Sequence, residues 1–516
     1  MRKLAFYLLF VGILLDSKLY SQCSDCAYKS DEIWISVENE QGFQLAKGSF
    51  KTNDPQLNDV FIKYETQQLE QVFPYSRIDR LKKLYKIKFK GNRDELISEL
   101  QNNKGIKRII KRPVENQIAL YEPSDYMWYL PTQQDPNGWL WHLKRIQAAN
   151  AWDITKGDAN IKIASLDTWF DINHPDLTIK IFPKYDPYDN TTYNSDCLKN
   201  NHGTTAVSFI AAETDGGGQL ASIGFKCMLI CYQAWDQNYI ERAHHASLAM
   251  NANVITSSAG GWTCTSAIDE DEKLAVKEIL DNGTIIVMPA GNGTTGTRCN
   301  YNGSDHAFKP LSPEYDERVI LVSSTNINDN HQYFSNGVDH THSHYPEVDI
   351  CAPGYDIMGA ACTQSKDASN NCIVNNWPYY GSYGGTSFST PIVAGVCALM
   401  KSINPCLTPA LAQSIIKSTA DPITDASLYP GLVGAGRINA YKCVMIAGTK
   451  SISGDLSGSV TYSAGYAINM NNATIQNNAN INIQARKEIN IGGPFEVQLG
   501  SSANFTIDEN SVNSCN

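Results

Sequence analysis

The chain has 516 residues, enough for about two to four domains of roughly 100–200 residues each. Its hydrophobic content of 42% is ordinary for a globular protein. The formal net charge of −11 argues against nucleic acid as the main partner.

Residues 1–22 are predicted to be a secretory signal peptide. Two basic residues precede an apolar run from Leu4 to Leu15, and a short polar stretch with small residues follows. The run is too short to cross a membrane, and no later stretch reaches about 18 consecutive apolar residues. We therefore expect a secreted protein, extracellular or at the cell surface, with no transmembrane segment. Lipid attachment at Cys23 is the less favoured alternative because Gln22 precedes it.

Fourteen cysteines in an exported chain favour disulfides. The predicted pairs are Cys362 with Cys372, which flank a polar loop, and Cys264 with Cys299. Cysteines in apolar segments fit buried free thiols at least as well, and these are Cys227, Cys231, Cys351 and Cys397. The spacing of Cys23 and Cys26 fits a terminal disulfide or a thiol pair better than a metal site.

Residues 23–137 are predicted to form a small α+β unit followed by a linker. The expected strands cover residues 34–37, 60–64, 84–89 and 106–110. A helix is expected over 94–101, with Asn92 and Glu95 as its capping box, and a proline-containing linker over 121–137. Between Arg77 and Arg112, thirteen Lys and Arg stand against four Asp and Glu. This basic run is either a solvated face or the counterpart of an acidic surface on the same chain.

Residues 138–447 alternate apolar strands with helical segments. The expected strands are 161–166, 228–232, 254–258, 284–288, 319–323 and 348–352. The expected helices are 204–212, 240–250, 269–281, 387–402 and 409–418. Continuous apolar strands separated by helices predict an α/β fold with a doubly wound parallel sheet. In such sheets, ligands and chemistry collect at the carboxyl ends of the strands.

Residues 448–516 are rich in Asn, Ser, Gly and Ile. Short phrases such as 473–475, 479–483 and 503–507 repeat an alternation of polar and apolar residues. The pattern predicts short strands stacked as a small β-repeat module, with a polar linker as the alternative.

Three separated segments carry the members of a nucleophilic triad. Asp167 ends an apolar strand, where an unpaired carboxylate would be costly. His202 opens a helical segment and is followed by a glycine. Ser387 follows two glycines and Thr386, which is expected to cap a helix that begins at the serine. A serine hydroxyl needs a histidine to take its proton and a carboxylate to orient that histidine, so the three residues predict nucleophilic catalysis.

A fourth segment places Asn292 between glycines just after a predicted strand. Its side-chain N–H and the backbone N–H of Ser387 are candidates for stabilising the oxyanion of a tetrahedral intermediate. The same Gly-Asn-Gly sequence taken alone is more typical of a turn.

These four segments together resemble the subtilisin-like (subtilase) serine protease family over residues 139–445. Asp167-Thr168 through Asp176-Leu177 resembles the family's aspartate motif, and His202-Gly203-Thr204 its histidine motif. Gly385-Thr386-Ser387 through Pro391 resembles the serine motif, and Ala290-Gly291-Asn292 the motif that carries the oxyanion asparagine.

The resemblance implies a serine endopeptidase that hydrolyses peptide bonds through an acyl-enzyme intermediate. It also implies a zymogen, whose N-terminal unit resembles propeptides that assist folding and inhibit the enzyme before they are removed. No cofactor is needed for the chemistry, no metal-ligating residue is assigned, and a structural calcium ion is common in the family. The C-terminal module resembles small β modules of secreted bacterial proteins, which suggests contact with the cell surface.

Substrate binding is expected at two segments. Ser258, Ala259 and Gly260 are predicted to pair with the substrate as an added strand. Ala290 and Gly291 are predicted to line the same site. Ala259 stands where the family often has leucine, and Pro289 replaces a common alanine, so the specificity pocket departs from the usual pattern.

His340, His342 and His344 alternate in a polar segment. On a strand they would share one face and could bind a transition metal, but a solvated loop is the favoured interpretation.

Two other functions fit the sequence less well. A catalytically silent scaffold that binds peptides, or a surface partner through its C-terminal module, would not need all four chemical groups. A lipase or esterase with the same triad is disfavoured by the chain order and by the absence of a Gly-x-Ser-x-Gly elbow at Ser387.

Overall fold

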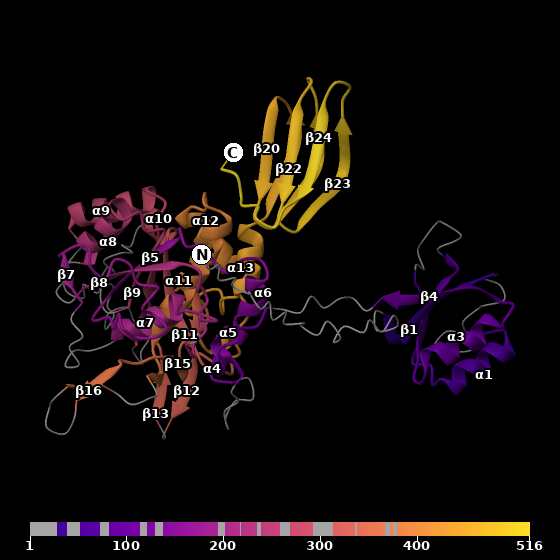
Figure 1. Ribbon diagram of the computed structural model, residues 1–516, viewed down its shortest axis with the longest axis horizontal. Helices are drawn as coiled ribbons and strands as arrows, with labels where there is room; N and C mark the ends of the chain where they lie inside the picture. The colour runs from indigo at the N-terminus through magenta and orange to yellow at the C-terminus, as the bar shows by residue number, and fades with distance from the viewer. Residues whose placement is uncertain are drawn as a thin grey trace, which may run out of the picture. The chain divides into compact units, whose positions relative to one another are not determined.

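The computed structural model describes a chain with two compact units, Met1–Ala119 and Leu120–Asn516 (Figure 1). The described residues are 28–38, 52–72, 82–113, 121–129, 138–193, 202–216, 218–234, 239–258, 269–292, 313–335, 338–366, 372–374 and 379–515. The expected signal peptide and Cys23 and Cys26 lie outside these residues, as do Cys264 and Cys299.

The first unit contains a four-stranded antiparallel sheet in the order β2-β3-β1-β4. Its strands are β1 Tyr28–Val37, β2 Gln68–Gln71, β3 Leu84–Lys88 and β4 Ile106–Pro113, and its helices are α1 Pro55–Lys63 and α3 Arg93–Gln101. Leu96 and Leu100 of α3 are fully buried. The side chain of Asn92 accepts hydrogen bonds from the backbone of Asp94 and Glu95, so it caps α3 at the predicted place.

The strand expected over residues 60–64 is wrong, because most of this segment belongs to α1. Asp54 caps the helix through the backbone N–H groups of residues 56 and 57, and Pro55 occupies the first turn, where a missing N–H is tolerated. Leu57 and Phe61 lie four residues apart and are both buried. The short apolar run is therefore one part of a helical stripe that begins earlier in the chain.

The second unit is built on a six-stranded sheet in the order β14-β11-β10-β9-β5-β8, and every neighbouring pair is parallel. Its strands are β5 Lys162–Asp167, β8 Met228–Gln233, β9 Val254–Ser257, β10 Ile285–Pro289, β11 Val319–Thr325 and β14 Ile350–Pro353. The predicted doubly wound α/β fold is confirmed, and each of the six expected strands is present.

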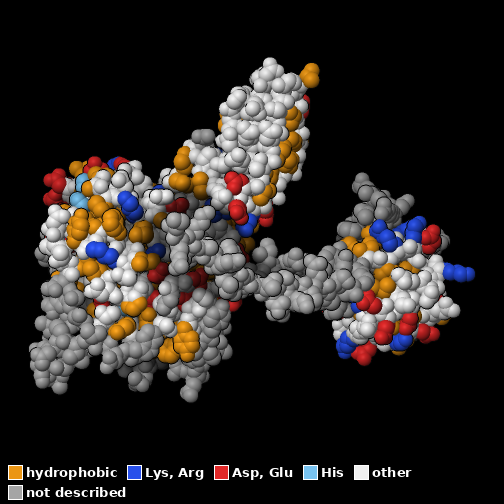
Figure 2. Space-filling view, viewed as in Figure 1, with side chains coloured by type: hydrophobic (Ala, Val, Ile, Leu, Met, Phe, Trp, Pro, Cys, Tyr) orange, Lys and Arg blue, Asp and Glu red, His pale blue; other side chains and the backbone are white. Residues whose placement is uncertain are grey.

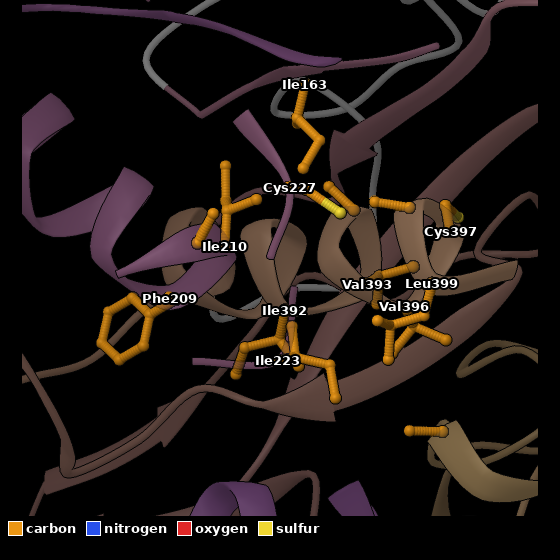
Figure 3. Close-up of a cluster of buried hydrophobic side chains, with 14 of the residues drawn as sticks. Ile163, Phe209, Ile210, Ile223, Cys227, Ile392, Val393, Val396, Cys397 and Leu399 are labelled. Carbon is orange, nitrogen blue, oxygen red and sulfur yellow. The ribbon is translucent and has the colours of Figure 1, made fainter. Parts of the chain in front are cut away.

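Helices cover both faces of this sheet (Figure 1). One face packs against α7 His202–Ala211 and α11 Thr386–Ile403, and the other against α8 Tyr239–Leu248 and α9 Glu270–Asp281. Successive residues of β5 alternate between these layers: Ile163 belongs to the first and Ala164 to the second. Figure 3 shows part of the first layer, where Ile163, Ile210 and Val393 lie in one apolar cluster.

The second unit has further short elements around the sheet. Its other helices are α4 Tyr126–Tyr129, α5 Trp141–Arg145, α6 Ala148–Trp152, α10 Pro313–Asp316, α12 Pro409–Ser418, α13 Ala440–Ala447 and the 3₁₀ helix η3 Ala426–Leu428. Its other strands, before the C-terminal stretch, are β6 Tyr185–Asp186, β7 Thr191–Thr192, β12 Gln332–Ser335, β13 Val338–Thr341, β15 Ile357–Ala360, β16 Gln364–Lys366, β17 Cys372–Val374 and β18 Tyr380–Tyr383.

Part of the expected linker packs into the second unit. Met127 and Trp128 are 8% and 3% exposed and belong to the same apolar cluster as α11. The Trp128 ring lies 5.7 Å from that of Trp152. The prolines of this segment indicated a loop, but its aromatic residues bury enough surface to hold it on the core.

Within the described part of the chain, one helix, α11, is long and apolar enough to cross a membrane. Because 94% of it is buried inside the protein, α11 is the central helix of the fold. Its residues pack against α7, α13 and five strands of the sheet, β5, β9, β10, β11 and β14.

Residues 450–507 form six strands in two three-stranded parallel sheets, β19-β21-β23 and β20-β22-β24. Their bounds are β19 Lys450–Leu456, β20 Ser459–Ala464, β21 Ala467–Ile475, β22 Asn480–Ala485, β23 Glu488–Val497 and β24 Ser502–Ile507. A disulfide joins Cys406 to Cys515, a pair that the sequence did not suggest. Arg486 also donates to the carbonyl of Ile154 at 2.6 Å, which ties the strands to the α/β core.

Four cysteines of the apolar segments, Cys227, Cys231, Cys351 and Cys397, are buried free thiols, as is Cys443. Burial raises the pKa of Cys227 to about 12, which leaves this thiol unreactive at neutral pH. The pairing of Cys362 with Cys372 stays a prediction.

Candidate active site

Three of the predicted site segments lie at the carboxyl ends of adjacent strands. Asp167 is the last residue of β5, Ser258 follows β9, and Asn292 lies three residues beyond β10. Because β10, β9 and β5 are neighbours in a parallel sheet, their carboxyl ends meet along one edge. The helices α7 and α11 begin at His202 and Thr386, so they add the histidine and Ser387.

Asp167 and His202 form a partly buried hydrogen-bonded pair. Nδ1 of His202 lies 2.8 Å from Oδ1 of Asp167, whose side chain is fully buried. The same oxygen accepts the backbone N–H of Thr168 at 2.6 Å, which fixes the carboxylate. A proton held on Nδ1 leaves Nε2 of the ring as the nitrogen that can accept another proton.

Two opposing effects act on the pKa of His202. Burial lowers it, but the hydrogen bond and the charge of Asp167 outweigh burial, so the pKa is raised above its usual value. The pair therefore stabilises an imidazolium, the species that forms when histidine takes a proton from a nucleophile.

Gly203 has no room for a side chain. A Cβ at this position would lie 2.8 Å from the carbonyl oxygen of Trp169 and 3.1 Å from Cβ of Asp167. The glycine after His202 thus allows the start of α7 to approach the end of β5, which brings the two catalytic candidates together.

Ser387 is the second residue of α11 and is half-buried. The ring of the next residue, Phe388, lies 5.0 Å from the ring of His202, measured between centroids. The structure therefore brings the start of the serine helix beside the imidazole. In this first turn, the N–H of Thr386 donates to Asn292, and those of Phe388 and Ser389 donate to the carbonyl of Gly385. The positive end of the helix dipole favours negative charge at Ser387.

The expected cap of α11 is wrong in its detail. Gly385 is the residue before the helix, with a φ of 134° that strongly favours glycine, and Thr386 is already helical. The Thr386 backbone N–H and hydroxyl both donate to Oδ1 of Asn292, at 2.8 and 3.0 Å. The hydroxyl in turn accepts the N–H of Gly291 at 3.2 Å. Thr386 thus orients Asn292 instead of capping its own helix.

This contact decides which end of the Asn292 amide is available. Since two donors of Thr386 meet Oδ1, the side-chain NH₂ group is turned away from Thr386 and can donate to a ligand. No feature of the sequence pairs Thr386 with Asn292, because the two residues are 94 positions apart.

The predicted substrate-binding residues are only partly described. Ser258 is buried, and Ala259 and Gly260 lie outside the described residues. Ala290 is fully buried, and the backbone N–H and C=O groups of Ala290 and Gly291 are all hydrogen-bonded inside the protein. The role of these residues in substrate binding stays a prediction.

The histidine-rich segment differs from the expected solvated loop. His342 is 4% exposed, and Nδ1 of His344 lies 3.3 Å from Nε2 of His331, which is fully buried. The rings of His331 and His344 both contact Tyr429, at 4.8 and 4.7 Å. Packing against aromatic neighbours from distant segments buries this polar sequence. The side chain of His340 is not among those described.

A set of buried oxygen atoms was not found from the sequence. Oδ1 of Asp125 and Oε1 of Gln219 are buried without a hydrogen-bond partner. Oδ1 of Asp176 accepts the backbone N–H of Gln219. The backbone N–H of Met127, two residues after Asp125, donates to the carbonyl of Gln219. Asp125, Asp176 and Gln219 therefore lie close together. Burial raises the pKa of Asp176 to about 7 and that of Asp125 to about 6. Orphaned oxygens beside buried carboxyl groups are the ligand type that a hard cation prefers.

Among the described residues, no group of three or more His, Cys, Asp or Glu side chains is arranged to hold a metal ion. A cation near Asp176 would therefore depend on the Gln219 amide and on backbone carbonyls as well as on the two carboxylates.

Comparisons with known proteins place the chain in a family. The model of the subtilase family, Peptidase S8, matches residues 158–465. Thermitase of Thermoactinomyces vulgaris is 31% identical over 301 residues, which cover 57% of this chain and 91% of that protein. The thermophilic serine proteinase of Bacillus sp. (strain AK1) is 29% identical over 372 residues, 71% of this chain and 79% of that protein. Fervidolysin from Fervidobacterium pennivorans, a keratinolytic enzyme related to subtilisin, is similar in structure with a TM-score of 0.46 and 18% identity, over 81% of this chain and 61% of that one.

Proposed function

The chain belongs to the subtilase family and is a serine endopeptidase that acts on protein or peptide substrates, and we propose that Ser387, His202 and Asp167 are its catalytic residues. The observation that supports this assignment best is the pair of His202 and fully buried Asp167 at 2.8 Å, next to the helix that begins with Thr386 and Ser387.

In the proposed mechanism, the Ser387 hydroxyl attacks the scissile carbonyl while Nε2 of His202 takes its proton. His202 then gives this proton to the leaving amine, and an acyl-enzyme intermediate remains on Ser387. Asp167 holds the ring in one tautomer and stabilises the imidazolium. Water repeats the same steps to release the acid product.

The oxyanion of each tetrahedral intermediate is proposed to accept from the NH₂ group of Asn292 and from the backbone N–H of Ser387. Loss of one such donor typically costs about 10²–10³ in turnover. The orientation that Thr386 imposes on Asn292 supports this role, because it leaves the amide donor and not the oxygen for the ligand.

The assignment is tested with Ser387→Ala. The variant should fold as the parent does, should not cleave casein, and should not react with a fluorophosphonate probe. Its precursor should also stay uncut between the N-terminal unit and the catalytic domain. A parent protein that folds but does not react with the probe would instead support the catalytically silent scaffold.

We propose that the protein is secreted as a zymogen and that its N-terminal unit inhibits the mature enzyme. The basic run of that unit and the acidic balance of the rest of the chain support a charge-assisted interaction. Figure 2 shows acidic side chains gathered over α9. Inhibition by the separately added unit should weaken at high salt, because salt screens exposed charges. Inhibition that does not change with salt would indicate apolar contacts instead.

A structural calcium ion at Asp125, Asp176 and Gln219 is also proposed. It would supply positive charge between two carboxyl groups that are otherwise buried without a cation, and it would take no part in the chemistry. Added calcium should raise the Tm of the Ser387→Ala protein, and Asp176→Asn should remove the increase. An equal increase in both proteins would place the ion elsewhere.

Contact with the cell surface is proposed for the C-terminal strands. The last repeat exposes large apolar side chains, with Ile491, Phe505 and Ile507 exposed by 49%, 42% and 57%. Figure 2 shows hydrophobic side chains along this part of the molecule. Removal of residues 448–516 in a Cys406→Ser background should leave peptide cleavage intact and release the protein from cells into the medium.

A further inference from the structure

The segment from His342 to Tyr345 contacts the backbone of Ala290 and Gly291, the two residues that precede Asn292. The backbone N–H of Ser343 donates to the carbonyl of Gly291 at 3.1 Å. The hydroxyl of Tyr345 donates to the carbonyl of Ala290, also at 3.1 Å. Tyr345 is 2% exposed, so its hydroxyl makes this bond away from water.

These carbonyls need partners because the strand has already ended. Strand β10 stops at Pro289, and the backbone N–H of Ala290 makes a last bond to the carbonyl of Val322 at 2.8 Å. Beyond this point, the sheet supplies no donor for the carbonyls of Ala290 and Gly291. A buried carbonyl without a partner is costly, and the peptide plane would turn to find one.

The supporting segment is itself held firmly. The Ser323 hydroxyl donates to the carbonyl of Ser343 at 2.8 Å, and the backbone N–H of Tyr345 donates to the carbonyl of Leu432 at 2.9 Å. The buried ring of His331 lies between two carbonyl oxygens, with Nε2 2.9 Å from His342 O and Nδ1 3.1 Å from Ser324 O. The histidine-rich sequence is thus part of a rigid support, which explains its burial.

We propose that Tyr345 is a positioning residue for the oxyanion site, acting through the backbone of Ala290 and Gly291 on Asn292. This inference rests on the proposed role of Asn292. Thr386 holds the Asn292 side chain, and Tyr345 and Ser343 hold the carbonyls of the two residues before it, Ala290 and Gly291. A donor that drifts by about 1 Å from the developing charge loses much of its effect on the transition state.

The test is Tyr345→Phe, which removes only the hydroxyl. Turnover of a fluorogenic peptide, derived from a mapped casein cleavage site, should fall about three- to tenfold with KM unchanged. Binding of a peptide aldehyde, whose hemiacetal places an oxygen in the oxyanion site, should weaken by the same factor. Binding of the matching peptide alcohol, which cannot form a hemiacetal with Ser387 and carries no oxyanion, should not change.

Tyr315→Phe is the matched control. Tyr315 is also buried, at 6% exposure, and its hydroxyl donates to the carbonyl of Lys273 at 3.1 Å, remote in the sequence from the catalytic residues. Both variants lose one tyrosine-to-carbonyl hydrogen bond of the same length, buried for Tyr345 and partly buried for Tyr315, so the Tm should fall in both. An equal loss of kcat in the two variants would show that Tyr345 matters only for stability and would overturn the inference.

A double-mutant cycle with Asn292→Ala separates the inference from the proposed function. If Tyr345 acts through Asn292, Tyr345→Phe should have no further effect on kcat in the Asn292→Ala background. Additive losses would show that Tyr345 acts elsewhere. An Asn292→Ala enzyme with the parent's kcat would instead refute the oxyanion role of Asn292. If Tyr345→Phe does not fold, Ser323→Ala takes its place, because it removes the hydrogen bond from the Ser323 hydroxyl to the carbonyl of Ser343. Like Tyr345→Phe, it should lower kcat in the parent and have no further effect in the Asn292→Ala background.

Discussion

Replacement of Asp167 by asparagine removes one negative charge from a fully buried position and keeps the shape of the side chain. The asparagine oxygen can still accept the backbone N–H of Thr168, which lies 2.6 Å from the carboxylate. The variant therefore loses the charge next to His202 and little packing. Because one oxygen, Oδ1, meets both Thr168 N–H and Nδ1 of His202, an amide that turns its NH₂ group to His202 gives up the Thr168 bond and favours the other tautomer of the ring.

We expect kcat to fall about 10⁴-fold, the size of loss that the same change causes in chymotrypsin-like enzymes, where the histidine adopts the wrong tautomer. This corresponds to roughly 5 kcal/mol in the barrier. The loss is large because the site is buried, so water cannot replace the missing charge.

The pKa of His202 should fall in the same variant. Burial, which lowers the pKa, remains, and the raising effect of Asp167 is gone. Activity requires the neutral ring, so the acid limb of the kcat/KM profile should move to lower pH. Because the pKa of His202 is raised in the folded state, the protonated ring stabilises the parent at pH values below its unfolded pKa of about 6.5. This contribution is lost as the pH rises through the pKa of His202 in the folded protein. The variant should therefore lose more stability at pH 5.5 than at pH 9.

The profile is measured with a fluorogenic peptide between pH 5 and pH 10, and the Tm is measured at pH 5.5 and pH 9. The Ser387→Ala protein serves as the baseline for residual hydrolysis. An acid limb that stays at the parent's position in Asp167→Asn would refute the argument, because the group that titrates would then not be the partner of Asp167.

Three further predictions follow from contacts near the site and at the C-terminus. Thr386→Val should lower kcat about 10-fold with KM unchanged, because Asn292 loses one of its two bonds to Thr386 and the N–H of Gly291 loses its acceptor. An unchanged kcat would show that the bond from the Thr386 backbone N–H alone orients Asn292. Gly203→Ala should reduce both activity and Tm, since its Cβ would meet the backbone of Trp169 at 2.8 Å; a fully active variant would mean that α7 shifts without cost. Cys515→Ser should lower the free energy of unfolding by about 2–4 kcal/mol, because Cys406 and Cys515 close a loop of 109 residues; in calorimetry the peptidase core should keep its own transition.

Local patterns in the sequence determined most of the architecture. The six strands of the parallel sheet and the helices α7, α8, α9, α11 and α12 each carry their signal within one continuous segment, as an apolar run or a helical stripe bounded by turn residues. The positions of Asp167, His202, Ser387 and Asn292 relative to these elements follow from the same patterns, since residues at strand ends and helix starts share one edge of such a sheet. The segment 60–64 shows the limit, because a short apolar run fits a strand or a helix equally well.

Only the tertiary structure decided which distant groups meet. The bonds of Thr386 to Asn292 and of Tyr345 to Ala290 span 94 and 55 residues, and the disulfide of Cys406 and Cys515 spans 109. The same holds for the burial of His342 and for the oxygens of Asp125, Asp176 and Gln219. A periodic pattern reports which side of its own element faces the core, but it carries no information on the partner. Hydrogen-bond partners are set by the packing of whole layers, and this packing appears only when the chain is folded.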